Sequence, residues 1–477
     1  MHPNWIMQRA SLTPERIGLS FGTQQWTFQQ LHEEASSIAQ KINTLGLRRG
    51  ERVALLAPSI PELIMVIYGC MHARLEMVML NGRLSEQELA YQVEDADVKA
   101  IFVQDQELHK LQPDDRIIPF SKLQQVEVAN VEIEQEWDEQ DTITIMYTSG
   151  TTGFPKGVRQ TVGNHSASAI SSVLNLGLVE RDTWLCIVPI FHISGFSILV
   201  RSLLYGMTIR LYEKFDVVSC AAEIIDGTVT KMSVVAVMLE HILSELERLQ
   251  QKAHPNFNAI LAGGGPIPVD YLQRAAKLHL PVSQTYGMTE TSSQTATLAN
   301  EDAFKKIGSS GKPLFFNRIK INKANEADRE GEILVRGPHV TPGYIGRFKN
   351  KPSTENGWLH TGDIGYLDED GYLYVVDRRS DLIISGGENV YPAEIENVLL
   401  AHPAVKEAGV CGIADEKWGQ VPVAYIVLKE NVDKECILDF CKTKLANYKI
   451  PKEIVFVAQL PRNGSNKLMR RKLKEIK

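Results

Sequence analysis

The sequence TITIMYTSGTTGFPKG fills positions 142–157 and contains the strongest local pattern in the chain. Its first six residues are β-branched or aromatic apart from Met146, so they favour a strand. The glycines that follow let backbone N–H groups approach an anion, the hydroxyl residues add donors, and Lys156 adds a positive charge. Because Gly157 follows Lys156, the pattern is not the P-loop. It predicts a loop that holds a triphosphate, with candidate residues Thr148, Ser149, Gly150, Thr151, Thr152, Gly153 and Lys156.

Outside this segment, short β-rich runs alternate with longer helical patterns. Arg52–Leu56, Ala100–Val103 and Val234–Val237 are of the first kind, and Phe28–Leu45 and Pro61–Ala73 are of the second. Strands that alternate with helices along a chain usually form parallel sheets with helices on their faces. The N-terminal part is therefore predicted to be a large α/β domain with parallel-rich sheets.

The pattern changes near Gly331. Glu332–Val335 and Leu359–Tyr366 are short strands bounded by Gly and Asp-Gly turns, which predicts a small antiparallel β subdomain. After Ser380, strands and helices follow at short spacing, which predicts a compact α+β domain. We therefore expect residues 1–379 to form the large N-terminal domain and residues 380–477 to form a small C-terminal domain.

The composition disfavours several classes of protein. Of the 477 residues, 44% are apolar and 23% are charged, as in an ordinary soluble enzyme, and a net charge of −7 disfavours a nucleic-acid binder. Met1–Leu12 lacks the apolar run of a signal peptide, and Leu63–Leu80 is interrupted by polar residues, so that it does not predict a membrane span. The six cysteines form no C-x-x-C pair, which is typical of a reducing compartment. We expect a cytoplasmic protein without membrane insertion, and its composition is compatible with a homo-oligomer.

The segment Tyr147–Gly157 resembles the phosphate-binding signature of the acyl-adenylate-forming superfamily, which includes acyl-CoA ligases, luciferases and the adenylation domains of peptide synthetases. Five further segments match the family's motifs in the expected order, so that the resemblance covers nearly the whole chain. It implies an enzyme that activates a carboxylic acid with ATP and Mg²⁺ as an acyl-adenylate and then transfers the acyl group to a thiol. In the acid–CoA ligases that thiol is coenzyme A, here expected as a substrate.

Three of these segments are Phe191–Gly195, Ala262–Pro266 and Gln284–Glu290. By resemblance, His192 lines the acid pocket near the reacting carboxylate, and the glycines of the second segment pack against adenine and the acid. In the third segment the tyrosine stacks on adenine and Thr289 reaches the α-phosphate. The nucleotide-binding residues that the resemblance implies here are Gly263, Gly264, Gly265, Thr285, Tyr286, Gly287 and Met288.

The resemblance also implies contacts for the metal and the ribose. Glu290 would bind Mg²⁺, which suits an ion that prefers phosphate oxygens and few carboxylates. Asp363, in the turn Thr361-Gly362-Asp363, resembles the family's acceptor of the ribose hydroxyl protons. Arg378 would add a second ribose contact.

The C-terminal part resembles the mobile portion of the family. Lys467 corresponds to the lysine that bridges the attacking carboxylate and the nucleotide phosphate, although Asn466 stands where the family usually has glycine. Ser380 corresponds to the hinge about which the C-terminal domain rotates between the two steps. After rotation, the loop at 385–389 would line the passage for the thiol of coenzyme A. Its candidate residues are Gly386, Gly387 and Glu388.

The segments Tyr286–Gln294, Ser380–Glu396 and Leu460–Arg470 resemble the o-succinylbenzoate–CoA ligases of menaquinone (vitamin K2) synthesis more than generic fatty-acid ligases. That aromatic acid has two carboxylates, and the one that does not react needs a cation or several donors. Arg201, downstream of His192 on a predicted helix, is the candidate cation. Ser293 and Gln294 are its candidate polar partners, and Gly264 belongs to the same pocket.

Three alternatives stay open at the level of the sequence. The enzyme could use another aryl or medium-chain acid, or it could load the acyl group onto a carrier protein. A catalytically silent nucleotide-binding protein is the third alternative. The presence of Lys467, Glu290 and Asp363 favours an active ligase over a silent protein.

Overall fold

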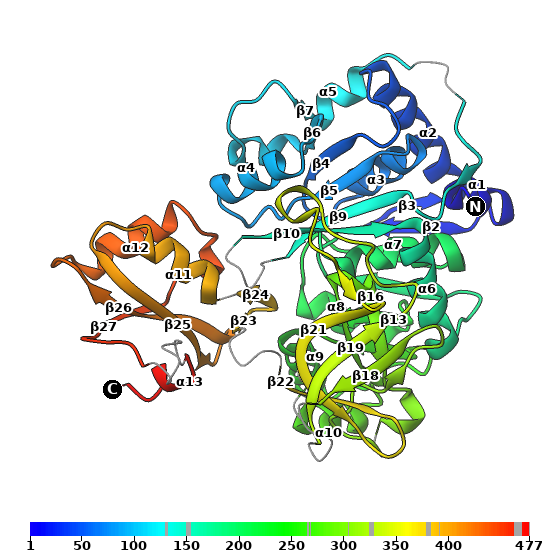
Figure 1. Cartoon of the computed structure of the whole chain (residues 1–477). Coiled ribbons are helices and arrows are strands. Elements are labelled where there is room, and N and C mark those ends of the chain that lie inside the picture. The colour runs from blue at the N-terminus through cyan, green and yellow to red at the C-terminus, as the bar shows by residue number, and fades with distance from the viewer. Residues whose placement is uncertain are drawn as a thin grey trace.

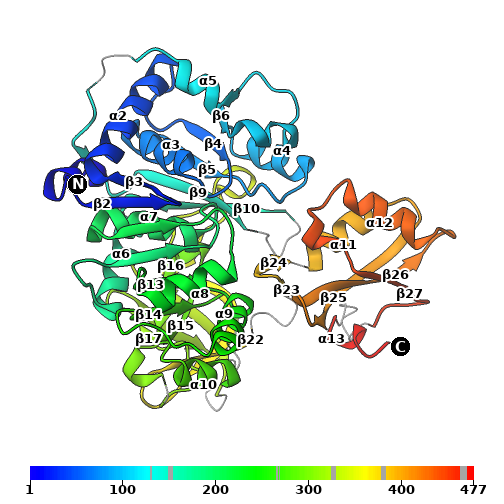
Figure 2. The same ribbon diagram turned by 180° about the vertical axis from the view of Figure 1, so that it is seen from behind.

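The computed structural model describes residues 1–128, 132–148, 154–264, 267, 269–303, 305–323, 329–377, 383–390, 392–461 and 470–476. Figure 1 shows a large N-terminal body and, beside it, a smaller C-terminal body. Figure 2 shows the same arrangement from behind, with β24 (Glu388–Val390) and α11 (Pro392–Leu400) on the side that faces the large body. The elements that face each other across this boundary form the site described below.

One sheet of the large domain is mostly parallel and carries the strands that flank the glycine-rich loop. The order across it is β10 (Lys156–Thr161), β9 (Thr142–Thr148), β5 (Glu76–Met79), β4 (Arg52–Leu56), β6 (Ala100–Val103) and β7 (Ile117–Pro119). Only β10 runs antiparallel to its neighbour among the described strands of this sheet. The helices of the large domain are α1 (Trp5–Leu12), α2 (Phe28–Thr44), α3 (Pro61–His72), α4 (Glu86–Asp95), α5 (Phe120–Gln125), α6 (Val162–Leu176), α7 (Ile193–Tyr205), α8 (Val217–Asp226), α9 (Ala236–Leu249) and α10 (Val269–Lys277).

Both faces of this sheet are buried. Successive side chains of a strand point to opposite faces, so Val53 and Leu55 of β4 pack with α2 and α3, whereas Ala54 and Leu56 pack with α4. Burial on both faces explains why the central strands are continuously apolar in the sequence. Capping boxes fix the starts of α2, α4 and α6 at Thr27, Ser85 and Thr161.

A second sheet carries the Gln284–Glu290 motif at the end of a strand. Its order is β17 (Lys312–Pro313), β16 (Ser293–Thr297), β15 (Val282–Met288), β14 (Ala259–Ala262), β13 (Lys231–Val234), β11 (Thr183–Cys186), β12 (Thr208–Leu211), β2 (Ile17–Phe21) and β3 (Gln24–Thr27). The strands from β15 to β2 are parallel to one another. Met232 of β13 packs with α8 and α9 on one face, whereas Trp184 of β11 belongs to the core that also contains α2, α3 and α7. This core therefore joins the two sheets into one domain.

The predicted β subdomain is present and antiparallel. Its strands are β18 (Arg318–Asn322), β19 (Gly331–Arg336), β21 (Trp358–Leu367), β20 (Thr354–Glu355) and β22 (Leu373–Asp377). Ile333, Val335 and Leu359 share a core with Tyr286 of β15. The subdomain is thereby fixed to the strand that bears the nucleotide motif.

The C-terminal domain has its own sheet and core. Its strands are β24, β23 (Ile383–Ser385), β26 (Gly419–Leu428), β25 (Val405–Asp415) and β27 (Glu453–Phe456), and its helices are α11, α12 (Lys434–Lys442) and α13 (Arg470–Leu473). Ile395, Leu399, Val410 and Ile426 are buried in a cluster confined to this domain. A separate core is expected of a unit that can move as a body.

The predicted fold class is confirmed: a large α/β domain with a β subdomain is followed by a small α+β domain. The predicted boundary at 379/380 lies outside the described residues and stays a prediction. The predicted strand Val234–Val237 is wrong, because β13 ends at Val234 and α9 begins at Ala236. The β-branched residues of that run belong to the turn between a strand and a helix. None of the helices in the described part of the chain has both the length and the apolar composition that crossing a membrane requires.

Candidate active site

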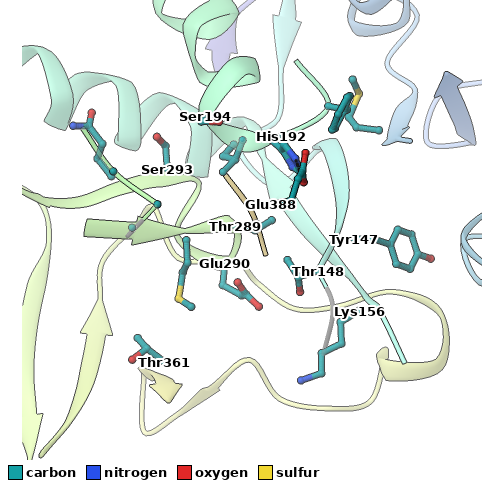
Figure 3. Close-up of a pocket in the computed structure, with 18 of the residues that line it drawn as sticks. Tyr147, Thr148, Lys156, His192, Ser194, Thr289, Glu290, Ser293, Thr361 and Glu388 are labelled. Atoms are coloured by element: carbon teal, nitrogen blue, oxygen red, sulfur yellow. Dashed lines mark hydrogen bonds and ion pairs between the residues drawn. The ribbon is translucent and has the colours of Figure 1, made fainter. Parts of the chain in front are cut away.

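A cavity of about 610 Å³ lies where the two domains face each other, and it brings most of the predicted residues together. Figure 3 shows labelled side chains that line it, from His192 and Glu388 at one end to Lys156 and Thr361 at the other. The predicted residues that line this cavity are Thr148, Lys156, His192, Arg201, Gly263, Gly264, Thr285, Gly287, Met288, Thr289, Glu290, Ser293, Gln294, Asp363, Gly387 and Glu388. Tyr286 and Gly386 lie next to it in sequence but are not part of its lining.

Several predicted residues fall outside the part of the chain that the structure describes. These are Ser149, Gly150, Thr151, Thr152, Gly153, Gly265, Arg378, Ser380 and Lys467. Their roles stay predictions.

The two ends of the glycine-rich loop are held firmly. Thr148 at the end of β9 pairs in register with Lys156 at the start of β10. The Tyr147 hydroxyl donates to Asp95 Oδ2 at 2.7 Å, and Asp95 Oδ1 accepts from the Arg347 backbone N–H at 2.8 Å. Lys156 Nζ lies 5.7 Å from the centre of the Tyr344 ring. Asp95 and Tyr344 were not predicted from the sequence, because their role depends on segments far apart in the chain.

Tyr286 and Asp363 meet at the end of the cavity that Thr361 lines. The Tyr286 hydroxyl donates to Asp363 Oδ2 at 2.8 Å, and both residues are buried. Thr285 donates its hydroxyl to the Ala296 carbonyl at 2.9 Å. Asp363 lines the cavity and accepts this hydrogen bond from Tyr286. Stacking of Tyr286 on adenine and binding of the ribose by Asp363 stay predictions.

Two of the predicted glycines leave no room for a side chain. A Cβ on Gly287 would lie 1.7 Å from the Ser293 carbonyl oxygen, and a Cβ on Gly263 would lie 2.8 Å from Thr285 Cγ2. Real Cβ contacts are never as short as the first of these. The β15–β16 connection therefore needs glycine at 287, and its close approach directs Ser293 and Gln294 towards the cavity.

Glu290 is the predicted ligand for Mg²⁺, and its surroundings fit that role. It follows β15 in the short helix η2 (Thr289–Thr291), beside Thr148 and Lys156 in the same cavity. Within the described residues, no group of three or more His, Cys, Asp or Glu side chains could hold a metal ion by itself. A single carboxylate next to a phosphate loop fits Mg²⁺, which takes most of its remaining ligands from phosphate and water.

Arg201 lines the cavity beside Ser293 and Gln294 and is 1% exposed. Its Nη2 donates to Gln294 Oε1 at 2.9 Å and lies 3.4 Å from Ser293 Oγ, and its guanidinium lies 4.9 Å from the Trp184 ring. Burial lowers the pKa of Arg201 from its ordinary value. Among the described residues no carboxylate forms a salt bridge with Arg201, and its Nε has no hydrogen-bond partner. A buried cation without a salt bridge is stabilised by an anionic ligand.

His192 lies at the junction of the two domains. It is the N-cap residue of α7, and its Nε2 is 3.1 Å from Glu388 Oε2, which belongs to the C-terminal domain. Glu388 Oε1 accepts from Arg83 Nη1 at 2.5 Å. Burial raises the pKa of Glu388, but the hydrogen bond with His192 and the charges of Arg83 and Lys449 outweigh that effect and hold the pKa below its ordinary value.

A buried ion triad joins the domains next to this contact. Lys449 Nζ lies 2.7 Å from Glu88 Oε1 of the large domain and 2.7 Å from Glu394 Oε1 of its own domain. Burial raises the pKa of Glu394 to about 7, whereas the charge of Lys449 lowers the pKa of Glu88 against its burial. Lys449 also lines the cavity. No sequence pattern predicted this triad, because its members are spread over 361 residues.

Two family models match the chain. The model described as AMP-binding enzyme matches residues 6–345, and the model described as AMP-binding enzyme C-terminal domain matches residues 394–467. A 2–succinylbenzoate–CoA ligase of Bacillus cereus is 47% identical over 479 residues, which cover 99% of this chain and 98% of that relative.

Two solved structures of o-succinylbenzoate CoA synthetase from Bacillus subtilis are similar throughout, at 45% identity. A double mutant bound with a product analogue has a TM-score of 0.94 and covers 100% of this chain and 98% of that one. The complex with the acyl-adenylate intermediate has a TM-score of 0.76 and covers 100% of this chain and 99% of that one. On sequence, on structure and on the residues that line the cavity, this chain belongs to the AMP-binding enzyme family.

Proposed function

We propose that this chain is an AMP-forming acid–thiol ligase that converts o-succinylbenzoate to o-succinylbenzoyl-CoA in menaquinone biosynthesis. The observation that supports it most directly is the buried Arg201 guanidinium at the acid end of a cavity whose other end carries the nucleotide motif. Such a cation can pair with the second carboxylate of a dicarboxylic acid, whereas a fatty acid has no second anionic group to offer it. The full-length similarity to 2-succinylbenzoate–CoA ligases supports the same substrate. The free cysteines support a cytoplasmic location, which is part of the proposal.

In the first step an oxygen of the acid's reacting carboxylate attacks the α-phosphorus of ATP. A P–O bond to the acid forms and the bond to pyrophosphate breaks, which leaves acyl-AMP. Thr289 faces the cavity beside Thr148 and Lys156, where it can stabilise the charge that builds on the α-phosphoryl oxygens. Glu290 would hold Mg²⁺, which neutralises phosphate charge when bound. Asp363 would accept hydrogen bonds from the ribose hydroxyls, and Arg378 would add a second ribose contact as a donor. Gly263 and Gly264 would let adenine approach the backbone.

In the second step the thiol sulfur attacks the acyl carbon. A C–S bond forms and the C–O bond to AMP breaks. We place the passage for the thiol along Gly387 and Glu388, which line the cavity from the C-terminal domain. Gly387 has φ +85°, and a Cβ there would lie 3.1 Å from Val235 Cγ2 of the large domain. Glycine at 387 thus lets the two domains approach each other along this passage.

The domain arrangement supports an assignment of this conformation to the second step. At equal identity, the TM-score is 0.94 with the product-analogue complex and 0.76 with the acyl-adenylate complex. Since the fold is common to both, we infer that the difference reflects how the domains are placed. We propose Ser380 as the hinge between the two placements.

The test of this function is acid-dependent release of pyrophosphate from MgATP. It compares o-succinylbenzoate with benzoate, 2-propylbenzoate and octanoate, each with and without coenzyme A. Selective release with o-succinylbenzoate, and a coenzyme A thioester as product, is expected. Pyrophosphate release with benzoate or octanoate instead would show that the acid is not o-succinylbenzoate. Pyrophosphate release without any coenzyme A thioester would point to a carrier protein as the acyl acceptor.

Lys467→Ala is expected to lower the rate of adenylation by about 10²-fold or more, because one preformed donor to a developing oxyanion has that effect. The measurement is pyrophosphate release in the absence of coenzyme A. Thioester formation from added acyl-AMP serves as the control, since by resemblance Lys467 leaves the site before that step. Adenylation at the rate of the unmodified chain would remove Lys467 from the mechanism.

A further inference from the structure

We propose that Glu388 is a positioning residue for the thioester-forming step: the C-terminal domain brings its carboxylate to His192, and the contact fixes the imidazole as the acceptor of the thiol proton. The inference rests on the proposed function and assigns to the Glu388–His192 pair the activation of the thiol. Figure 3 shows the two side chains next to each other at one end of the cavity.

The contact has hydrogen-bond length, is made across the domain boundary and is sheltered on its Glu388 side. Glu388 Oε2 lies 3.1 Å from His192 Nε2, and the Glu388 side chain is 8% exposed while that of His192 is 42% exposed. Glu388 is the first residue of β24, directly after the turn at Gly386 and Gly387. The carboxylate is therefore placed by the backbone of the C-terminal domain, whereas the imidazole is placed by the start of α7.

The hydrogen bond determines which ring nitrogen can act as a base. An ionised carboxylate can only accept, so the neutral imidazole must donate from Nε2 and keeps its lone pair at Nδ1. The same bond fixes the plane of the ring. A histidine held by a carboxylate in this way is the usual device for activating a nucleophile, because the carboxylate also stabilises the imidazolium that forms.

The step balances as a proton transfer coupled to acyl transfer. The S–H bond of the thiol breaks and an N–H bond forms at His192 Nδ1. The thiolate electrons form the C–S bond, and the electron pair of the C–O bond leaves with the phosphate oxygen of AMP. Glu388 stays ionised throughout and contacts His192 with Oε2 and Arg83 with Oε1, so its proposed effect on the thiol is exerted through His192.

The alternative role for Glu388 is a simple domain contact through Arg83, whose side chain is 54% exposed. The two roles differ in their dependence on His192. A residue that acts through His192 has no effect once His192 is gone, whereas a domain contact keeps its effect.

The experiment measures thioester formation in a single turnover, with acyl-AMP preformed on the enzyme and coenzyme A added at saturation. Glu388→Gln keeps the shape of the side chain but removes its charge, and it is expected to lower this rate by roughly 10²-fold, as loss of acid–base catalysis does. The KM for coenzyme A is expected to change little, and Glu388→Asp is expected to recover part of the rate. In a His192→Ala background, Glu388→Gln is expected to cause no further loss.

Arg83→Met is the matched control, because it removes the other partner of the same carboxylate. Two outcomes would overturn the proposal and leave Glu388 as a domain contact. One is that Glu388→Gln lowers the rate of thioester formation further in the His192→Ala background. The other is that Arg83→Met lowers this rate as much as Glu388→Gln does. A thioester product from o-succinylbenzoate and the unmodified chain tests the proposed function separately. Failure of the Glu388 inference is therefore distinguishable from failure of the function.

Discussion

Arg201→Leu is expected to raise the KM for o-succinylbenzoate by roughly 10²-fold or more, because loss of one partner from a buried charged pair costs about 2–5 kcal/mol. The guanidinium is 1% exposed, and its hydrogen bonds go to Gln294 and Ser293, neither of which carries charge. The substrate's second carboxylate would be the anion that this cation lacks. Initial rates of pyrophosphate release against substrate concentration give the KM.

The controls for Arg201 separate a binding role from a role in folding. A 2-substituted benzoate without the second carboxylate, such as 2-propylbenzoate, is expected to react with both proteins at similar KM. The melting temperature is expected not to fall, since replacing an unpaired buried charge with an apolar side chain is often neutral or stabilising. Arg201→Lys keeps the charge but not the planar guanidinium, so its KM for o-succinylbenzoate is expected to lie between that of the unmodified chain and that of Arg201→Leu. An unchanged KM for o-succinylbenzoate in the leucine variant would exclude Arg201 from the pocket.

Lys449→Met is expected to slow thioester formation by roughly 10²-fold, because removing the cation from a buried triad costs about 3–5 kcal/mol. Glu88 and Glu394, whose side chains are 11% and 10% exposed, would then face each other without a counter-ion. The cost falls on the domain arrangement described here, since rotation of the C-terminal domain would return these groups to water. Single-turnover thioester formation from preformed acyl-AMP is the measurement, and adenylation is expected to suffer less.

The direction of the pH dependence follows from Glu394. Burial raises its pKa to about 7 even though the charge of Lys449 lowers it, so that removal of Lys449 is expected to raise this pKa further and to let the two carboxyl groups share a proton at neutral pH. The loss in Lys449→Met is therefore expected to grow as the pH rises above neutrality and both groups ionise. Glu88→Gln, which removes only the interdomain partner, is the matched control and is expected to slow thioester formation less. Equal losses in both half-reactions would show that Lys449 supports the fold and not the arrangement.

Local patterns of the sequence were sufficient for most of the elements. The run Arg52–Leu56, which is apolar from Val53 onward, predicted β4 to the residue, because a strand buried on both faces needs apolar side chains along its buried part. The run Val234–Val237 misled, since β-branched residues also occur where a buried strand turns into a helix. The β propensity of a residue does not by itself set where a strand ends. Here β13 ends at Val234, and α9, which shares its core with β13, begins two residues later.

The sequence by itself determined the fold class and most of the residues that line the cavity, because the predicted nucleotide-binding motifs are short runs of neighbouring residues. Gly287, for example, is required by a backbone contact six residues away. Only the tertiary structure decided which side chains meet across the domains. His192 and Glu388 are separated by 196 residues, and Glu88 and Lys449 by 361. No local pattern encodes such pairs, since their energy depends on a burial that exists only after the two domains have come together.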